Sequence, residues 1–186
     1  MADFHKFYPT LKVEEGGYAS EAYALKKKDS GGRTYLGIAE NYNKTWEGWP
    51  LIDAWIKIHG EPKWNQKIPS DAIYAAAEKH TKVAYWDKLF LDQINNQSLA
   101  EQIFDFGFNS GLGLSAKFVQ RIIGHSETTV FNSNDIAGIN IFDQEKLFNT
   151  LKNMRVDMIK KSTIINPDSK PALIARASKF IFKNNV

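Results

Sequence analysis

Several features that define common classes of protein are missing from the 186-residue sequence. It has no cysteine, which excludes disulfide bonds and thiolate metal sites and suits a chain made in a reducing cytoplasm. Its four histidines are scattered without metal-ligand spacing, and no phosphate-binding glycine loop or nucleotide fingerprint is present. No apolar run reaches the ~18 residues of a transmembrane helix. We therefore expect a protein that needs no cofactor or metal ion and does not span a membrane.

The residues that are present favour a globular, helical protein. Apolar residues make up 43% of the sequence and aromatic residues 13%, which distinguishes it from a disordered chain. Good helix formers and 3.6-residue apolar patterns dominate, so we predict a mostly α-helical fold. The expected helices span residues 3–16, 50–59, 71–90, 97–110, 114–123, 143–159 and 171–182. Residues 17–36 and 125–142 are predicted to be loops, the first with a turn or short hairpin around Asp29-Ser30-Gly31-Gly32.

A pair of glutamates stands at the expected end of the first helix, before Gly16-Gly17. Paired glycines favour a helix end, because glycine takes the left-handed conformation that a helix C-terminus uses. At ~100° per residue, Glu15 lies roughly 30° from the centre of the helix's apolar stripe and Glu14 roughly 70°. Glu15 is thus the better candidate for a carboxyl group that faces a cleft, where burial and the negative helix end disfavour charge. Such a group can act as a general acid, whereas the alternative is two ordinary exposed glutamates.

Motifs along the first two thirds of the chain are similar to those of one family. The series begins with Glu15-Gly16-Gly17-Tyr18 and Asp29-x-Gly31-Gly32-x-Thr34-x-x-Gly37-Ile38, and continues with Tyr85-Trp86-Asp87, Phe104–Gly111, Gln120-Arg121 and Gly124. In this order the motifs, within residues 4–125, resemble glycoside hydrolase family 108. Its members are phage-type N-acetylmuramidases, or endolysins, with a lysozyme-like fold, and some are called secretion activator proteins.

The resemblance implies a peptidoglycan hydrolase that cleaves the β-1,4 bond between N-acetylmuramic acid and N-acetylglucosamine, with Glu15 as general acid. Glycosidases commonly use a second carboxylate, as nucleophile or as the base that activates water, and Asp29 is the motif residue suited to this role. An aspartate before Ser-Gly-Gly is also a common turn residue that bonds its own backbone. Some lysozyme-like enzymes work with a single glutamate, so both interpretations of Asp29 stay open.

Five further residues are candidates for the site. Thr34 is expected to orient the attacking water, unless it is only a β-branched strand residue. Tyr18 and Tyr35 are expected to contact sugar rings, and their alternative is a place in the core. The same choice applies to the tryptophans Trp46, Trp49, Trp64 and Trp86. Asp105 and Asn109 share a helix face at i and i+4. The resemblance puts that face on the substrate side, whereas the residues alone indicate a solvated face.

We expect one lysozyme-like domain over residues 1–186. It would contain a catalytic segment at residues 1–92 and a peptidoglycan-binding-like helical segment at 93–186, packed on the first. The last third departs from the family pattern, because residues 134–138 only loosely match its Asp-Gly-x-x-Gly motif and Arg176 alone is a possible match to its final arginine. This departure weakens the case for wall contacts by the last third.

Two alternative functions remain at this point. One is a catalytically inactive peptidoglycan-binding or secretion-associated module, which would bind cell wall without releasing reducing ends. The other is a nucleic-acid binder, which the net charge of +3 allows, but the lysines are dispersed and no nucleic-acid motif accompanies them. We therefore expect a monomer whose partner is the peptidoglycan glycan strand, with no nucleic acid or membrane partner.

The N-terminus also bears on where such a protein would act. Residues 1–7 show no basic region followed by an apolar run, so we expect no signal peptide. The chain would be made in the cytoplasm and would reach the cell wall through a holin or another release route.

Overall fold

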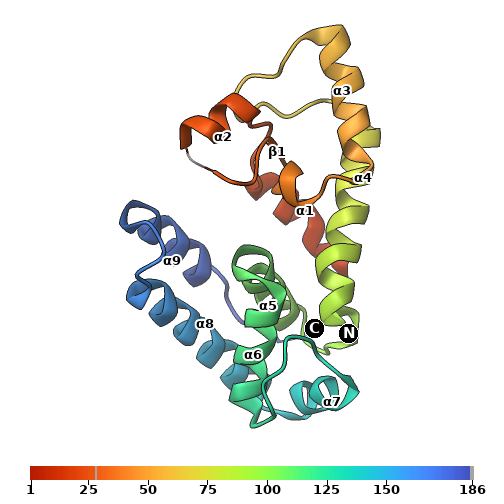
Figure 1. Ribbon diagram of the computed structural model, residues 1–186. Coiled ribbons are helices and arrows are strands. Elements are labelled where there is room, and N and C mark those ends of the chain that lie inside the picture. The colour runs from red at the N-terminus through yellow and green to blue at the C-terminus, as the bar shows by residue number, and fades with distance from the viewer. Residues whose placement is uncertain (28, 185–186) are drawn as a thin grey trace. The chain divides into compact units, whose positions relative to one another are not determined.

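The computed structural model describes residues 1–27 and 29–184, and it is mostly helical (Figure 1). Its α-helices are α1 (Phe4–Glu14), α2 (Glu21–Lys27), α3 (Gly48–His59), α4 (Asp71–Thr81), α5 (Gln97–Ser110), α6 (Leu112–Ile123), α7 (Ser133–Ile141), α8 (Gln144–Lys161) and α9 (Lys170–Ser178). The described residues contain one hairpin, in which β1 (Thr34–Tyr35) pairs with β2 (Ile38–Ala39). The short elements are a π-helical turn, η2 (Lys82–Trp86), and the 3₁₀ turns η1 (Glu40–Tyr42), η3 (Asp87–Leu89), η4 (Leu91–Gln93) and η5 (Pro167–Ser169). The prediction of a mostly α-helical fold is confirmed.

The described residues form two compact units. The N-terminal unit comprises His5–Lys82, and the C-terminal unit comprises Met1–Phe4 with the described residues from Val83 on. The first residues belong to the C-terminal unit because the backbone N–H of Ala2 donates to the carbonyl of Ile94 at 2.7 Å. The division thus falls within η2. The expected catalytic segment at residues 1–92 and wall-binding segment at 93–186 stay a prediction.

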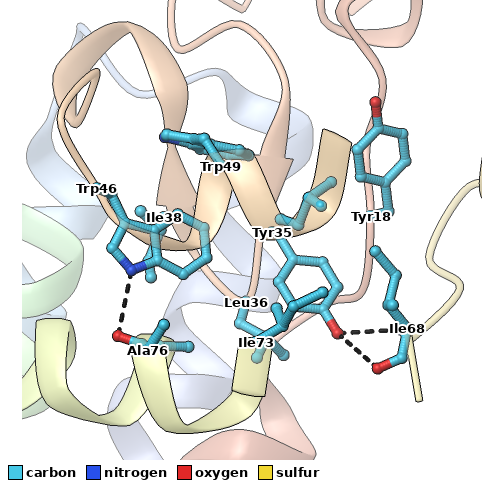
Figure 2. Packing of buried hydrophobic residues seen from close by; sticks show 11 residues of the cluster. Tyr18, Tyr35, Leu36, Ile38, Trp46, Trp49, Ile68, Ile73 and Ala76 are labelled. Carbon is cyan, nitrogen blue, oxygen red and sulfur yellow. Dashed lines mark hydrogen bonds between the residues drawn. The ribbon is translucent and has the colours of Figure 1, made fainter. Parts of the chain in front are cut away.

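A cluster of buried aromatic and aliphatic side chains forms the core of the N-terminal unit (Figure 2). The Tyr35 hydroxyl donates to the carbonyl of Ile68 at 3.3 Å and accepts from its N–H at 3.0 Å. The indole N–H of Trp46 donates to the carbonyl of Ala76 at 3.2 Å. Because an unpaired buried polar group costs about 1–3 kcal/mol, these bonds allow the large rings to be buried. The buried members of the cluster are Tyr18, Tyr35, Leu36, Ile38, Trp46, Trp49, Ile52, Ile68, Ile73, Ala76 and Ala77.

Two helices lie where the sequence predicted loops, and both begin at a capping side chain. In α2, Ser20 Oγ accepts a hydrogen bond from the N–H of Tyr23 at 3.2 Å. In α7, Asn132 and Asp135 form a capping box. α2 also carries Glu21 in its first turn and lysines in its last, which complements the helix dipole. A good cap stabilises a helix by about 1 kcal/mol, so these short helices form without a long apolar stripe.

Helix α5 lies at the centre of the C-terminal unit, where it contacts α6, α8 and α9 (Figure 1). These neighbours cover Asp105, one of the two residues on the helix face that was expected to be solvated or to face substrate, and leave Asn109 exposed. Asp105 is only 1% exposed, and its carboxylate accepts hydrogen bonds from Arg155 Nη1 and Arg176 Nε, both at 2.7 Å. The expectation for Asp105 is therefore wrong, because two arginines from α8 and α9 supply the charge that allows a buried carboxylate.

Candidate active site

Glu15 is the first residue after helix α1. Its N–H donates to the carbonyl of Leu11 at 2.9 Å, so the residue continues the last helical turn, and its side chain is partly buried. The ammonium group of Lys67 donates to the carbonyl of Lys12 at 2.6 Å and lies 3.4 Å from that of Val13. A cation at this position offsets the partial negative charge of the helix end. Glu15 therefore stands at a helix end that a lysine stabilises, which the sequence analysis did not anticipate.

The glycines after Glu15 allow another segment to approach closely, which corrects the sequence interpretation. Neither Gly16 nor Gly17 has a positive φ, so neither supplies the left-handed helix end that was expected. A Cβ atom on Gly17 would instead lie 2.4 Å from the carbonyl oxygen of Asn65 and 2.5 Å from that of Gln66. The N–H of Gly17 donates to Asn65 Oδ1 at 2.8 Å, and Tyr18 and Gln66 are joined by a backbone hydrogen bond of 2.9 Å. Segment 65–66 thus pairs with segment 17–18 beside Glu15.

The β1–β2 hairpin also forms backbone hydrogen bonds to the segment that follows Glu15. Its turn lies at Leu36 (φ 48°) and Gly37 (φ 78°). The predicted turn at Asp29–Gly32 is also present, but it precedes the hairpin. Two left-handed residues make the kind of turn that matches the twist of a hairpin. The N–H of Leu36 donates to the carbonyl of Gly16 at 3.1 Å, so the turn is bonded to the residue that follows Glu15. Leu36 is a non-glycine residue in a left-handed conformation, which costs of order 1–3 kcal/mol and persists because its side chain is buried in the core.

Asp29 and Thr34 both make local backbone contacts. Asp29 is exposed, and its Oδ1 accepts a hydrogen bond from the N–H of Gly31 at 2.8 Å, which is the turn-forming contact named as its alternative role. Thr34 pairs with Ala19 through backbone hydrogen bonds of 2.8 and 2.9 Å, and its hydroxyl donates to the carbonyl of Gly32 at 3.3 Å. A catalytic role for either residue stays a prediction.

Replacing Asp29 by asparagine separates its two possible roles. The amide oxygen of the new side chain can still accept from Gly31, so we expect Asp29→Asn to keep cleavage of purified peptidoglycan within about threefold of the parent. If Asp29 instead activates water or attacks the sugar, turnover should fall by about a hundredfold or more. Initial rates of reducing-end release, measured on proteins with matched melting temperatures, decide between the two.

The two tyrosines predicted to contact sugar rings are core residues (Figure 2). The Tyr18 hydroxyl donates to Glu61 Oε1 at 3.2 Å. Burial raises the pKa of Tyr18, and the Glu61 carboxylate raises it further. Burial also raises the pKa of Tyr35, whose ring has no exposed surface. The expectation that Tyr18 and Tyr35 lie against substrate is corrected to its alternative, because aromatic burial stabilises this small unit.

Arg33, which was not among the predicted site residues, joins the start of the hairpin to Glu40 and to helix α3. Arg33 Nε and Nη2 donate to the two carboxylate oxygens of Glu40 at 2.6 and 2.8 Å, and Nη1 binds Asp53 on α3. The guanidinium carbon lies 4.8 Å from the centre of the Trp49 ring. The hydrogen bond to Asp53 raises the pKa of Arg33, burial opposes this, and Glu40 adds to the rise. The position of Arg33 inside the glycine motif, directly before Thr34, was the available signal.

Asn109 lies in the C-terminal unit, at the exposed end of α5. Its amide nitrogen donates to the carbonyl of Asp105 at 2.7 Å and lies 3.2 Å from Asp105 Oδ1. Its amide is thus oriented by its own helix, and its assignment to the substrate side stays a prediction. Among the described residues, no group of three or more acidic or histidine side chains could hold a metal ion, and no helix is long and apolar enough to cross a membrane.

A glutamate directly after the first helix, bonded through its neighbours to a small hairpin in a mostly helical chain, is the arrangement of a lysozyme-like protein. The chain belongs to the glycosyl hydrolase 108 family, whose sequence model matches residues 9–111. This span contains every candidate site residue, from Glu15 to Asn109. The family makes the protein a glycoside hydrolase and implies lysozyme-like activity on peptidoglycan.

A solved structure shows the same fold. The structure of Brucella abortus SagA matches with a TM-score of 0.66 and 22% sequence identity, over 95% of this chain and 94% of that chain. The likeness therefore includes α7, α8 and α9, which lie beyond the residues that the family model matches. No curated protein matches the chain.

Proposed function

We propose that the protein is an N-acetylmuramidase, which hydrolyses the β-1,4 bond between N-acetylmuramic acid and N-acetylglucosamine with Glu15 as general acid. The observation that carries this proposal is the fixed position of Glu15. The residue before it ends α1, and the carbonyl of Gly16 after it accepts from Leu36 in the hairpin turn. A general acid has to come within about 2.6–3.2 Å of the leaving oxygen, and a backbone held on both sides lowers the cost of that alignment.

The proposed reaction needs one proton donor and one water molecule. The leaving oxygen of N-acetylglucosamine takes the proton of Glu15 as the bond to C1 of the muramic acid residue breaks. Water adds to C1, and the proton that it releases restores the carboxyl group of Glu15. Thr34 is suited to orient this water, because its hydroxyl hydrogen points to the carbonyl of Gly32 and its oxygen keeps lone pairs that accept from water. Asp29 has no assigned step in this scheme, since its carboxylate binds Gly31.

Incubation with purified peptidoglycan tests the proposal against the inactive-module alternative. The proposal predicts that soluble reducing ends appear in proportion to time and protein concentration. Binding to insoluble peptidoglycan without any new reducing ends would contradict the proposal and favour the wall-binding module.

A further inference from the structure

One tryptophan of the N-terminal unit differs from the others in its exposure. Trp46 and Trp49 are buried and Trp55 is partly buried, whereas Trp64 is 64% exposed. Its ring stacks on that of Tyr23 in α2, with 5.7 Å between the ring centres and 29° between the ring planes. One side of the indole is therefore supported by a second aromatic ring, and the exposed remainder of its surface is open to a ligand.

The backbone holds this aromatic pair in a fixed place. Trp64 directly precedes Asn65, whose N–H donates to the carbonyl of Tyr18 at 2.8 Å and whose side chain accepts from Gly17. Asn65 itself has a left-handed backbone (φ 63°), a conformation that asparagine adopts more readily than most residues. On the other side of the pair, the N–H of Tyr23 binds the capping hydroxyl of Ser20. The fold thus orders the backbone on both sides of the ring pair before any ligand binds. This order lowers the entropy that is lost on binding.

The same hydrogen bonds connect Trp64 to the candidate acid. Two peptide units separate Glu15 from Gly17, one hydrogen bond joins Gly17 to Asn65, and Trp64 is the next residue. The indole therefore belongs to the segment that is bonded to the backbone beside Glu15, so a long ligand bound at Glu15 has this ring as a candidate contact. A glycan strand is such a ligand, because its sugar rings repeat on both sides of the bond that is cleaved.

We propose that Trp64, supported by Tyr23, is a sugar-binding subsite on which one pyranose ring of a peptidoglycan strand stacks. Pyranose rings have an apolar C–H face that suits the flat, electron-rich face of an indole. The ammonium group of Lys27 lies 5.9 Å from the centre of the Tyr23 ring, and Lys63 precedes Trp64. These cations complement the carboxylates that muramic acid and its peptides carry. This inference rests on the proposed function, since it takes the glycan strand as the substrate.

Binding is measured on proteins that carry Glu15→Gln, so that the glycan ligand is not cleaved during the titration. The probe is a set of soluble, peptide-free peptidoglycan glycan strands, titrated by calorimetry. We expect Trp64→Ala to weaken binding about tenfold, because it removes the indole ring and with it the apolar surface that the sugar would cover. Trp64→Phe should stay within about threefold of the parent, since it keeps an aromatic face. The matched control is Ile58→Ala, which removes an exposed apolar side chain from α3 and should leave the affinity unchanged.

A second readout places the ligand on the indole. Acrylamide should quench the emission of exposed Trp64, and bound strands should reduce this quenching in the parent. In Trp64→Ala, where only the other tryptophans emit, added strands should leave the quenching unchanged. An affinity that is the same in Trp64→Ala and the parent overturns the subsite, as does a parent protein that binds no strands. If Glu15→Gln is inactive while Trp64→Ala binds normally, the subsite fails and the proposed function stands. If Glu15→Gln still cleaves while Trp64→Ala binds weakly, the role of Glu15 fails and the subsite stands.

Discussion

Glu15→Gln is expected to lower peptidoglycan cleavage by about two to four orders of magnitude, the usual contribution of a positioned general acid. The amide keeps the size and hydrogen-bonding shape of the side chain but has no acidic proton to donate. The protein should remain folded, because the backbone bonds of Leu11, Gly16 and Leu36 around this residue do not involve the carboxyl group. Binding to insoluble peptidoglycan should persist for the same reason. The measurement is the rate of reducing-end release, with thermal melting and pull-down on the same protein batch.

The neighbouring residue provides a matched control for this substitution. Glu14→Gln makes the same chemical change on an exposed side chain at the end of α1, and we expect near-parental activity from it. An active Glu15→Gln protein would show that the acid has been assigned to the wrong residue. Loss of activity in Glu14→Gln alone would transfer the assignment to Glu14.

Asp105→Asn is expected to reduce the free energy of unfolding of the C-terminal unit by about 3–5 kcal/mol. The substitution removes the carboxylate that is bonded to the buried guanidinium of Arg155, which is itself 1% exposed. Burial already lowers the pKa of Arg155, and the Asp105 carboxylate opposes that change. Without this carboxylate, the charged arginine stays buried and uncompensated. Chemical denaturation followed by circular dichroism measures the loss.

An exposed ion pair in the same unit serves as the control for Asp105→Asn. Glu127 accepts two hydrogen bonds from Arg121 at 2.7 and 2.8 Å, but both side chains are open to solvent. Because water screens such a pair, Glu127→Gln should leave the unfolding midpoint almost unchanged. Equal effects of Asp105→Asn and Glu127→Gln would contradict the assigned importance of the buried pair.

The helices that sequence patterns predicted best are those with a long apolar stripe. α1, α3, α5 and α8 all lie within a few residues of their expected bounds, because burial of one face both creates the pattern and stabilises the helix. α2 and α7 were missed because they are short and carry no long apolar stripe. Their signals are the caps Ser20 and Asn132, which a search for apolar periodicity does not weigh.

The site was harder to predict, because its key contacts join residues far apart in the chain. The glycine pair after Glu15 was interpreted as a helix stop, yet Gly17 is required by the backbone of Asn65, 48 residues away. Asp105 was placed on an exposed helix face, yet its arginine partners lie 50 and 71 residues away. Local sequence shows where the charged and polar side chains stand, but it does not show which distant partner buries each of them.

The identity of the sugar at each new reducing end of the cleaved glycan strand tests the central claim most directly. Purified peptidoglycan is digested with the protein and reduced with borohydride, and the sugar alcohols are then identified after acid hydrolysis. An N-acetylmuramidase leaves muramic acid at every new reducing end, so the account predicts that muramicitol forms in proportion to cleavage and that Glu15→Gln forms almost none. Glucosaminitol in place of muramicitol, or cleavage without any reducing end, would contradict it.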